Sequence, residues 1–480
     1  MSTLKEFEIK QNNAWEALKD HVGAEAGEEL VSALKELYSI YDDGLIEWFA
    51  NLYDVETGAW YYSCSARDNE EVEDKGIKFK LRPDIESTHQ ALRFINHSGL
   101  VSDSGGNYKN ALPEWMRNDI LKFAMSLQDK NGFFYHPQWT MEKTDKLLSR
   151  RARDLMWSVD IITTLGSQPT YDTPSGVKGS GLDFYGNSVK MPEAVNASAD
   201  APKPKSTATY SPDFENKDTL IDYLERLKVT CGKGLRFYAI GNTMTSQVSQ
   251  IRKRDNDLRE MGLEANLCET LINWFNENQN PENGLWEPTS DYLGVNGLLK
   301  ISGVYSGCGV EMPLADLAAE AAIAAIVSDE PIHAGVDLYN TWFAISCIIG
   351  NLRKYGKEKE IDGVILDGNA RADRIIKKLH TIAPAAVRKS KEKISSFKRS
   401  DGGYSYFPSG STSHSQGMPV SIPGSEESDV NGCIIASHEL VGYIYSALGL
   451  SKYKVPMFGA VHFERYMEIV ENNKARMKNA

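Results

Sequence analysis

The feature that most constrains the fold is a short glycine–aromatic segment that occurs four times along the chain. Each copy has an acidic residue, then a glycine and then large side chains, and each follows a segment with helical periodicity. Glycine adopts the left-handed conformation that ends a helix, and the aromatic run after it packs over the helix end. A motif that recurs at helix ends predicts a repeat of helical hairpins. The copies are Asp401-Gly402-Gly403-Tyr404-Ser405-Tyr406-Phe407-Pro408 and residues 54–62, 129–135 and 282–287.

Most of the remaining chain has the apolar spacing of α-helices. Leu30, Ala33, Leu34 and Leu37, for example, follow the 3.6-residue period. Between residues 243 and 279 the periodic stretch is too long for one ordinary helix, so we expect Gly262 to divide it. Strand signals are scarce: residues 77–81 alternate, and the segments around Trp60, Phe134 and Tyr404 are suited to local pairing. These patterns predict an all-α protein of roughly a dozen to fifteen helices, with short β segments in loops.

The motif resembles the glycine–aromatic repeats of α/α-toroid proteins. Gln128-Asp129-Lys130-Asn131-Gly132-Phe133 and Asp401-Gly402-Gly403-Tyr404 are similar to the Gln-x-x-Asp-Gly-Gly-Trp repeat of the terpenoid cyclase and protein prenyltransferase superfamily. Toroid glycosidases, polysaccharide lyases and sugar epimerases use similar turns at their helix ends. The resemblance covers four short segments and implies an (α/α) toroid of about six helical hairpins. In that fold, inner helices ring a central funnel and outer helices wrap them.

One stretch breaks the helical pattern. Residues 166–216 are rich in Pro, Gly, Ser, Thr and Lys, with Ala201-Pro202-Lys203-Pro204-Lys205 at their centre. A long segment of this composition is typical of an insert, a lid or a linker. We therefore expect residues 1–480 to form a single toroid domain, in which residues 166–216 are an irregular insert or lid between two halves.

Charge and cysteine usage exclude several classes of partner. A net charge of −13 and a pI near 5.3 argue against nucleic acid, which needs a basic surface, and against anionic membranes. The first eleven residues lack the apolar core of a secretory signal, and no apolar run is long enough to span a bilayer. No two of the six cysteines have metal-ligand spacing, so reduced thiols in a cytoplasmic protein are expected. We expect neither a metal nor another cofactor, and the oligomeric state stays open.

The terpenoid chemistry that the resemblance suggests lacks its motifs. No Asp-x-Asp-Asp acid motif is present, and Asp42-Asp43-Gly44-Leu45-Ile46-Glu47 only approximates the Asp-Asp-x-x-Asp magnesium motif. No Cys/His/Asp set has convincing zinc spacing. P-loop, dinucleotide-binding, HExxH and GxSxG motifs are also missing. A terpenoid cyclase or prenyltransferase therefore stays an analogy at the level of the fold.

Aromatic side chains beside hydrogen-bonding groups suggest a sugar as the substrate. A sugar ring has apolar C–H faces and polar edges, which suit aromatic faces next to amides, carboxylates and hydroxyls. Packing of the helix ends is the competing explanation for each aromatic residue. The substrate-binding candidates are Trp60, Tyr62, Tyr135, His136, Trp139, Arg150, Arg153, Trp286, Tyr305, Tyr404, Tyr406 and Gln416.

Glycoside hydrolysis requires two carboxylates that flank one bond. The catalytic candidates are Glu86, His89, Asp154, Glu287, Asp337, Glu427 and Asp429. Structural roles compete with catalysis: Asp429 and Asp337 are suited to capping helices, Glu86 to a solvated face, and Asp154 to an ion pair with Arg150 or Arg151.

Lyase or epimerase chemistry instead needs a base, together with cations that hold a carboxylate. His89, Tyr135, His136, Tyr305 and the arginines at positions 150, 151 and 153 are suited to those roles. The sequence thus predicts a carbohydrate-active enzyme acting on an oligosaccharide or another small molecule, with glycoside hydrolysis first. The alternatives are a polysaccharide lyase or sugar epimerase, a terpenoid cyclase or prenyltransferase, and a non-catalytic scaffold that binds a glycan or peptide.

Overall fold

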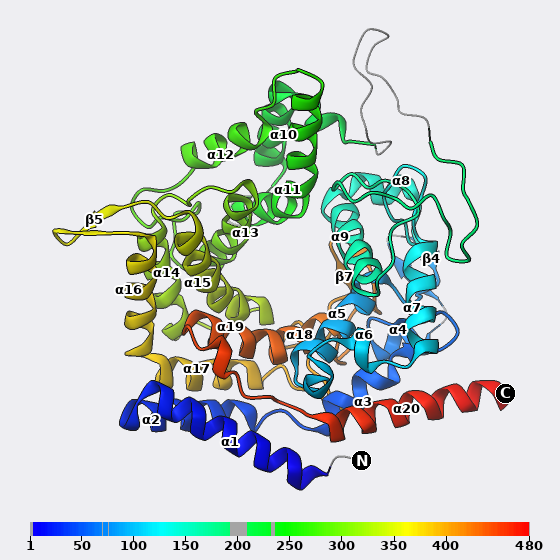
Figure 1. The fold of residues 1–480 in the computed structure, drawn as a ribbon, viewed down its shortest axis with the longest axis horizontal. Helices are drawn as coiled ribbons and strands as arrows, with labels where there is room; N and C mark the ends of the chain where they lie inside the picture. Colours follow the sequence, from blue (N-terminus) through cyan, green and yellow to red (C-terminus); the bar gives the residue numbers. More distant parts are fainter. Residues whose placement is uncertain (1–2, 70, 75, 193–208, 232–235, 480) are drawn as a thin grey trace. The chain divides into compact units, whose positions relative to one another are not determined.

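The computed structural model describes residues 3–69, 71–74, 76–192, 209–231 and 236–479. About 61% of the chain is helical and 6% is strand, which confirms the all-α class (Figure 1). The chain divides into two compact units. Unit 1 comprises Met1–Ile120, Ala322–Ser346 and Asp373–Ala480, and unit 2 comprises Leu121–Ala321 and Cys347–Ala372. No helix of the described residues is long and apolar enough to cross a membrane.

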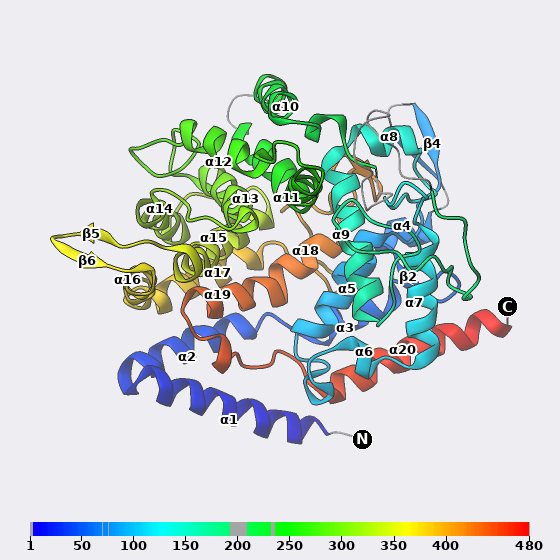
Figure 2. The ribbon, with the colours of Figure 1, turned by 45° about the horizontal axis from the view of Figure 1, so that its top comes forward.

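Three parallel helical segments form the interior of unit 1. They are α5 (Ile85–His97), the first half of α15 (Gly335–Tyr355), and a continuous helix made of α18 (Val430–Ile434), the π-helical turn Ile435–Glu439 and α19 (Leu440–Ala447). Glu86 contacts Asn431, and Arg93 contacts Glu439, so α5 and α18–α19 run in the same direction. They lie side by side in both ribbon views (Figure 1 and Figure 2).

Amphipathic helices pack around this interior. Helix α2 packs against α17 and α1, and α20 packs against α3. A break before α3 lies at Asp42, whose side chain caps that helix. A second break was missed: Gly23, at φ +101°, separates α1 from α2. The helices of unit 1, some of which cross the unit boundary, are α1 (Leu4–Val22), α2 (Ala24–Tyr38), α3 (Asp43–Asn51), α4 (Cys64–Asp68), α6 (Tyr108–Ala111), α7 (Glu114–Ser126), α16 (Gly368–His380), α17 (Ala383–Ser395) and α20 (Ala460–Asn479), with short 3-10 turns at Ser102–Ser104 and Ser451–Tyr453.

Unit 2 also contains a pair of parallel helices. Helix α11 (Arg236–Glu260) packs along α13 (Tyr292–Cys308) and also contacts α9 (Leu148–Thr164). Gly241 faces Ile301 and Gly307 faces Val248, so α11 and α13 are parallel, and glycines let the two helices approach closely. The predicted division at Gly262 is confirmed, since α11 ends at Glu260. The other helices are α8 (Met141–Lys146), α10 (Lys217–Thr230), α12 (Leu267–Glu277), α14 (Ala315–Val327) and the 3-10 turn Pro212–Phe214.

The four glycine–aromatic segments share one turn geometry. Gly58, Gly132, Gly284 and Gly402 all have positive φ, between +70° and +100°, as a helix-ending glycine requires. In two copies a glutamine at the end of the preceding helix reaches the next loop. Gln128 exchanges hydrogen bonds of 3.0 Å with the backbone of Tyr171, and Gln279 donates to the carbonyl of Pro313 at 2.9 Å. In these two copies the motif therefore connects a helix end to a later loop.

Strands occur only as short antiparallel pairs within the described residues. The predicted local pairing is confirmed, because Trp60 pairs with Tyr53, Phe134 with Gln128 and Tyr404 with Lys398. The alternating segment 77–81 contributes β4. The four hairpins are β1–β2 (Tyr53–Asp54, Ala59–Trp60), β3–β4 (Val72–Asp74, Ile77–Phe79), β5–β6 (Lys359–Ile361, Val364–Leu366) and β7–β8 (His414–Ser415, Met418–Pro419).

The predicted insert 166–216 is only partly described. Its described residues carry an isolated bridge between Leu182 and Ser188 and the 3-10 turn Pro212–Phe214. The central Ala201–Lys205 segment lies outside the described residues. The single toroid domain and the role of residues 166–216 as a lid stay predictions.

Candidate functional site

Glu86 is the centre of a buried polar cluster in unit 1. Its helix starts at Asp84, whose carboxylate accepts the backbone N–H of Ser87 at 2.9 Å. The Glu86 residue is only 2% exposed, so the competing prediction of a solvated face was wrong. One carboxylate oxygen, Oε1, accepts from Ser415 Oγ at 2.7 Å and from Asn431 Nδ2 at 3.0 Å. Helix α5, helix α18 and hairpin β7–β8 therefore meet at one carboxylate.

The hairpin that contacts Glu86 belongs to a long loop, residues 408–428, which follows the glycine–aromatic segment 401–408. Gln416 forms its turn with φ +50°, a conformation that costs energy for a residue with a side chain. Asp429 fixes the base of this loop, as it accepts the backbone N–H groups of Gly432 (2.8 Å), Tyr406 (2.8 Å) and Thr412 (3.2 Å). The prediction that Asp429 caps α18 is confirmed, and the same carboxylate also positions the loop.

Complete burial controls the chemistry of two neighbouring groups. Burial raises the pKa of Asp429 to about 7, although its three backbone N–H partners favour the charged form. The Tyr62 phenol lies near both Asp429 and Glu86, and burial followed by these charges raises its pKa well above 10.0. Its hydroxyl has no hydrogen-bond partner among the described residues. The Tyr62 hydroxyl, near Asp429 and Glu86, is therefore a candidate contact for a polar ligand.

A second polar layer lies two helical turns further along α5. Arg93 Nη2 is 2.5 Å from Glu439 Oε1, and the Glu439 side chain is 2% exposed. The hydroxyl of Tyr339 interacts with Glu439, and that of Tyr443 interacts with Arg93. Glu439 ends the π-helical turn, within which Ser437 has the non-helical angles φ −113° and ψ −112°. Such π turns are frequent at functional sites.

Three aromatic rings stand beside this ion pair. Phe343 and Tyr443 stack with ring centroids 3.8 Å apart and planes 20° from parallel. Tyr339 meets Tyr443 edge to face at 5.4 Å. All three rings are partly exposed, although they lie on the helices that form the interior of unit 1. Partly exposed aromatic rings beside charged groups suit a ligand with an apolar face and polar edges.

In unit 2, the predicted arginines at positions 150 and 153 have partners within the protein. Arg150 Nε is 2.8 Å from Asp154 Oδ1, and both side chains are at most 2% exposed. The expected ion pair with Arg150 is thus confirmed. The Arg150 guanidinium also lies 4.5 Å from the ring centre of Trp139, which packs against His136. Arg153 donates to Asn242 Oδ1 at 2.6 Å.

Four other predicted residues of unit 2 have local structural partners. Glu287 accepts the backbone N–H of Phe237 at 2.8 Å, in the first turn of α11. Trp286 donates to the carbonyl of Phe275 at 2.8 Å, and the Tyr305 hydroxyl donates to Asn276 at 2.6 Å. The Tyr135 hydroxyl donates to Asp145 at 2.8 Å, and burial raises its pKa to about 12. These contacts favour packing as the explanation for this group.

The remaining predicted residues of unit 1 lie near helix ends. Trp60 Nε1 donates to the carbonyl of Phe49 at 3.2 Å, and the Tyr404 hydroxyl donates to that of Ile40 at 2.6 Å. Asp337 lies in the first turn of α15, where it accepts the N–H groups of residues 333 and 334. His89 is 7% exposed and lies one turn after Glu86 on α5. Tyr406 donates its backbone N–H to Asp429.

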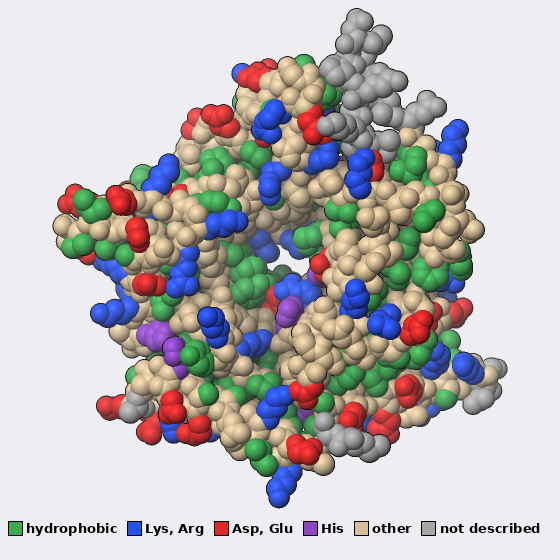
Figure 3. Space-filling view, in the orientation of Figure 1, with side chains coloured by type: hydrophobic (Ala, Val, Ile, Leu, Met, Phe, Trp, Pro, Cys, Tyr) green, Lys and Arg blue, Asp and Glu red, His purple; other side chains and the backbone are tan. Residues whose placement is uncertain are grey.

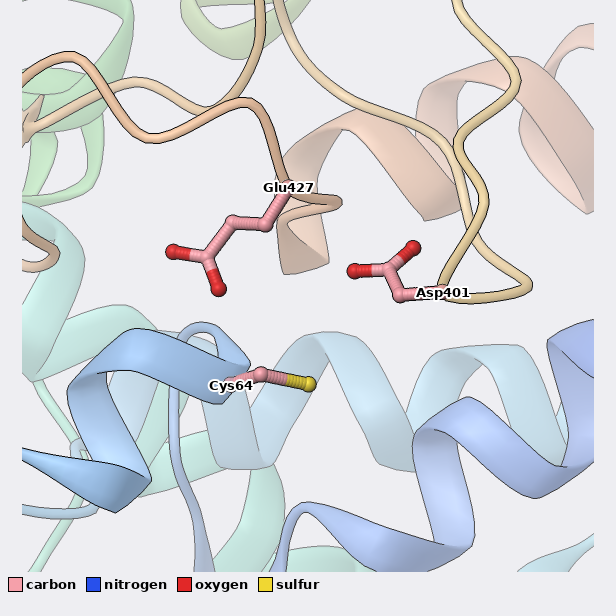
Figure 4. Close-up of side chains that lie close together, drawn as sticks. All are labelled: Cys64, Asp401 and Glu427. Carbon is pink, nitrogen blue, oxygen red and sulfur yellow. The ribbon is translucent and has the colours of Figure 1, made fainter.

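Glu427 belongs to a separate trio with Cys64 and Asp401, shown in Figure 4. Ligand atoms of the three residues lie within 4.8 Å of one another, close enough to hold a metal ion. Both carboxylates already accept hydrogen bonds, Glu427 from the backbone N–H of Ser65 and Asp401 from that of Ser428. Burial raises the pKa of the Cys64 thiol to about 11. These hydrogen bonds give the trio a role in joining loops.

The sequence predictions omitted five residues of the two polar layers. One local signal was available for part of the set: Ser437, His438 and Glu439 form a polar triplet within the otherwise apolar stretch 430–448. The other three positions have no comparable signal. The omitted residues are Arg93, Ser415, Asn431, His438 and Glu439.

The surface and the comparisons place no further limit on the site. Acidic and basic side chains are interspersed over the face of the molecule that Figure 3 shows. Comparison of the chain with protein-family models, with curated proteins and with solved structures finds no match.

Proposed function

We propose that the chain is a carbohydrate-active enzyme with an (α/α)-toroid fold that hydrolyses glycosidic bonds at the Glu86 cluster. The main observation behind this proposal is the buried Glu86 carboxylate. Helix α5, helix α18 and the long loop converge at this group. A carboxylate that is buried among hydroxyl and amide donors is the kind of group that glycosidases use as acid or base. Partly exposed aromatic rings on the neighbouring helices supply faces on which sugar rings can stack.

Parallel helices within each unit support the toroid. In an α/α toroid the inner helices are parallel, and each is linked to the next through an outer helix. In unit 1 the parallel segments belong to α5, α15 and α18–α19, and in unit 2 α11 and α13 are parallel. The glycine turns follow α3, α7, α12 and α17, and each of these helices precedes one of the parallel segments in the sequence. Within each unit, the proposed toroid would use these parallel segments as inner helices.

In this proposal one carboxyl group acts as the general acid and a second acts as the general base. Glu86 donates its proton to the glycosidic oxygen as the bond to the anomeric carbon breaks. Glu439, held by Arg93, accepts the proton of the water that attacks that carbon. The two residues occupy parallel helices, and α5 rises about 10 Å between residues 86 and 93. The proposal places the attacking water between the two carboxylates, as in an inverting mechanism. Asp429 positions the loop and takes no part in proton transfer.

A screen of the purified chain against a panel of oligosaccharides tests the proposal. Release of reducing ends by the native chain and its loss in Glu86→Gln are the expected results. Glu287→Gln is the matched control, because an amide oxygen can still accept the N–H of Phe237. Equal activity of the native chain and Glu86→Gln on a cleaved substrate would refute the assignment of Glu86. An inactive native chain across the panel would count against hydrolysis.

Elimination or epimerisation is a second candidate, favoured by His89. This histidine lies one turn from Glu86 and is 7% exposed, so a base and a carboxylate share one region of α5. A base of this kind would remove the proton next to a sugar carboxylate or carbonyl. The same panel separates the two reactions, because elimination gives an unsaturated product that absorbs ultraviolet light and hydrolysis does not.

A further inference from the structure

We propose that Arg93, together with Glu439 and the rings of Tyr339, Phe343 and Tyr443, forms a subsite for a sugar residue that carries a carboxylate. A uronic acid is the ligand class that fits. This inference rests on the proposed function and deepens it, because it specifies the substrate chemistry beside the Glu86 cluster.

The first argument is the partly exposed guanidinium. The Arg93 side chain is 35% exposed, whereas its partner Glu439 is 2% exposed. A guanidinium has five N–H donors in a planar fork, so the contacts of Arg93 with Glu439 and the Tyr443 hydroxyl leave other donors for a second carboxylate. Arginine binds carboxylates through paired hydrogen bonds, which give orientation as well as affinity. Arg93 can therefore bind a ligand carboxylate while it holds Glu439.

The second argument is the local charge. Two cations, Arg93 and Lys454, act on the single carboxylate of Glu439. The buried His438 is neutral, because burial, followed by the charges of His97, Arg93 and Lys454, lowers its pKa well below 6.5. Among these groups, the positive charges outnumber the negative ones. A ligand carboxylate would balance this excess, whereas a neutral sugar would not.

The third argument is an imidazole that lacks partners. His438 is 2% exposed, and neither ring nitrogen has a hydrogen-bond partner among the described residues. Its Nε2 is 3.9 Å from Glu439 Oε1, which is too far for a hydrogen bond. Most buried polar groups in proteins are hydrogen-bonded, so this imidazole is a candidate contact for a ligand. The imidazole adjoins the Arg93–Glu439 pair, so a bound hydroxyl or carboxylate there would satisfy it.

The fourth argument is the aromatic surface. The Phe343 and Tyr443 rings stack, and Tyr339 stands edge-on to Tyr443. These rings provide an apolar face for the C–H side of a pyranose, while Arg93 reaches its substituent. Arg93 follows Glu86 by seven residues on α5, an axial distance of about 10 Å. The Arg93 subsite would therefore hold a sugar residue adjacent to the bond that Glu86 cleaves.

The test compares two probes that differ only at C6, methyl β-D-glucuronoside and methyl β-D-glucoside, by isothermal titration calorimetry on the full chain. We expect the glucuronoside to bind about ten- to a hundredfold more tightly, as charge-assisted hydrogen bonds predict. Arg93→Gln should abolish that preference. Arg388→Gln should keep it, because Arg388 is similarly exposed and pairs with glutamates elsewhere in unit 1. Circular dichroism would confirm that each variant is folded.

The single substitution leaves Glu439 buried without its cation, which can unfold the chain. The double variant Arg93→Gln/Glu439→Gln removes both charges and keeps the test valid. Equal binding of the two probes by the native chain would overturn the inference, as would a preference that survives in the folded double variant. Binding is measured without turnover. A negative result here is therefore distinct from loss of activity in Glu86→Gln, which tests the hydrolytic function alone.

Discussion

Substitution of Gly402 by alanine tests the structural role of the glycine–aromatic turns. Gly402 has φ +100°, and a methyl group there would lie 2.7 Å from the carbonyl oxygen of Gly44 and 2.9 Å from its carbonyl carbon. Both contacts are with backbone, which cannot rotate away. The left-handed conformation costs an alanine about 1–2 kcal/mol, and overpacking adds about 1–3 kcal/mol. Gly402→Ala should therefore lower the free energy of unfolding by about 2–5 kcal/mol.

Gly424→Ala is the matched control for this experiment. Gly424 has φ +75° in the same loop region, and a methyl group there would meet nothing within 4 Å. Gly424→Ala should lower the free energy of unfolding only by the cost of the left-handed conformation, about 1–2 kcal/mol. Urea denaturation followed by circular dichroism measures both values on the full chain. If the two variants lose the same stability, then the turn does not pack against α3 as described, and its role in joining helix ends is wrong.

Three further predictions concern the residues around the candidate site. The pKa of Asp429 rises from 3.8 to about 7 on folding, so between these pH values the folded state keeps a proton that the unfolded state loses. The free energy of unfolding should therefore fall as pH rises through this window, by at most about 1.4 kcal/mol per pH unit. Asp429→Ser should reduce this slope in denaturation measured at several pH values, and an unchanged slope would contradict the prediction. Arg150→Ala should destabilise the chain by about 3–5 kcal/mol, because it removes one partner of a buried ion pair. Arg153→Ala is the control, and equal losses in thermal unfolding would count against a buried pair. Glu287→Ala should lower the free energy of unfolding by about 0.5–2 kcal/mol, because α11 loses a capping hydrogen bond, and it should leave activity intact. A loss of activity without a loss of stability would instead indicate a catalytic role for Glu287.

Local signals predicted the helix ends well. Glycines and capping carboxylates act within a few residues, so the break at Gly262 and the cap by Asp429 could be inferred from short segments. The Arg150–Asp154 pair was accessible for the same reason, because both residues share one helix face. The break at Gly23 was missed because no change in apolar spacing marks it.

Burial of the site residues could not be inferred in this way. Glu86 is enclosed by Ser415 and Asn431, which follow it by 329 and 345 residues in the sequence. A polar helix face looks the same in a sequence whether it meets water or another polar helix. The π-helical turn that precedes α19 also depends on packing, since its residues carry no signal for an extra residue in the turn. Aromatic segments were identified correctly as features, but their contacts became known only from the structure.

The most direct test of the central claim is the hydrolysis rate of Glu86→Ala with and without sodium formate, on a substrate that the native chain cleaves. If Glu86 transfers a proton, then its removal should slow hydrolysis by about 10²–10⁴-fold. Formate, a carboxylate small enough to occupy the space of the missing side chain, should restore part of the rate. A folded Glu86→Ala variant that keeps the native rate, or one that formate leaves unchanged, would contradict the assignment of Glu86 as the catalytic carboxylate.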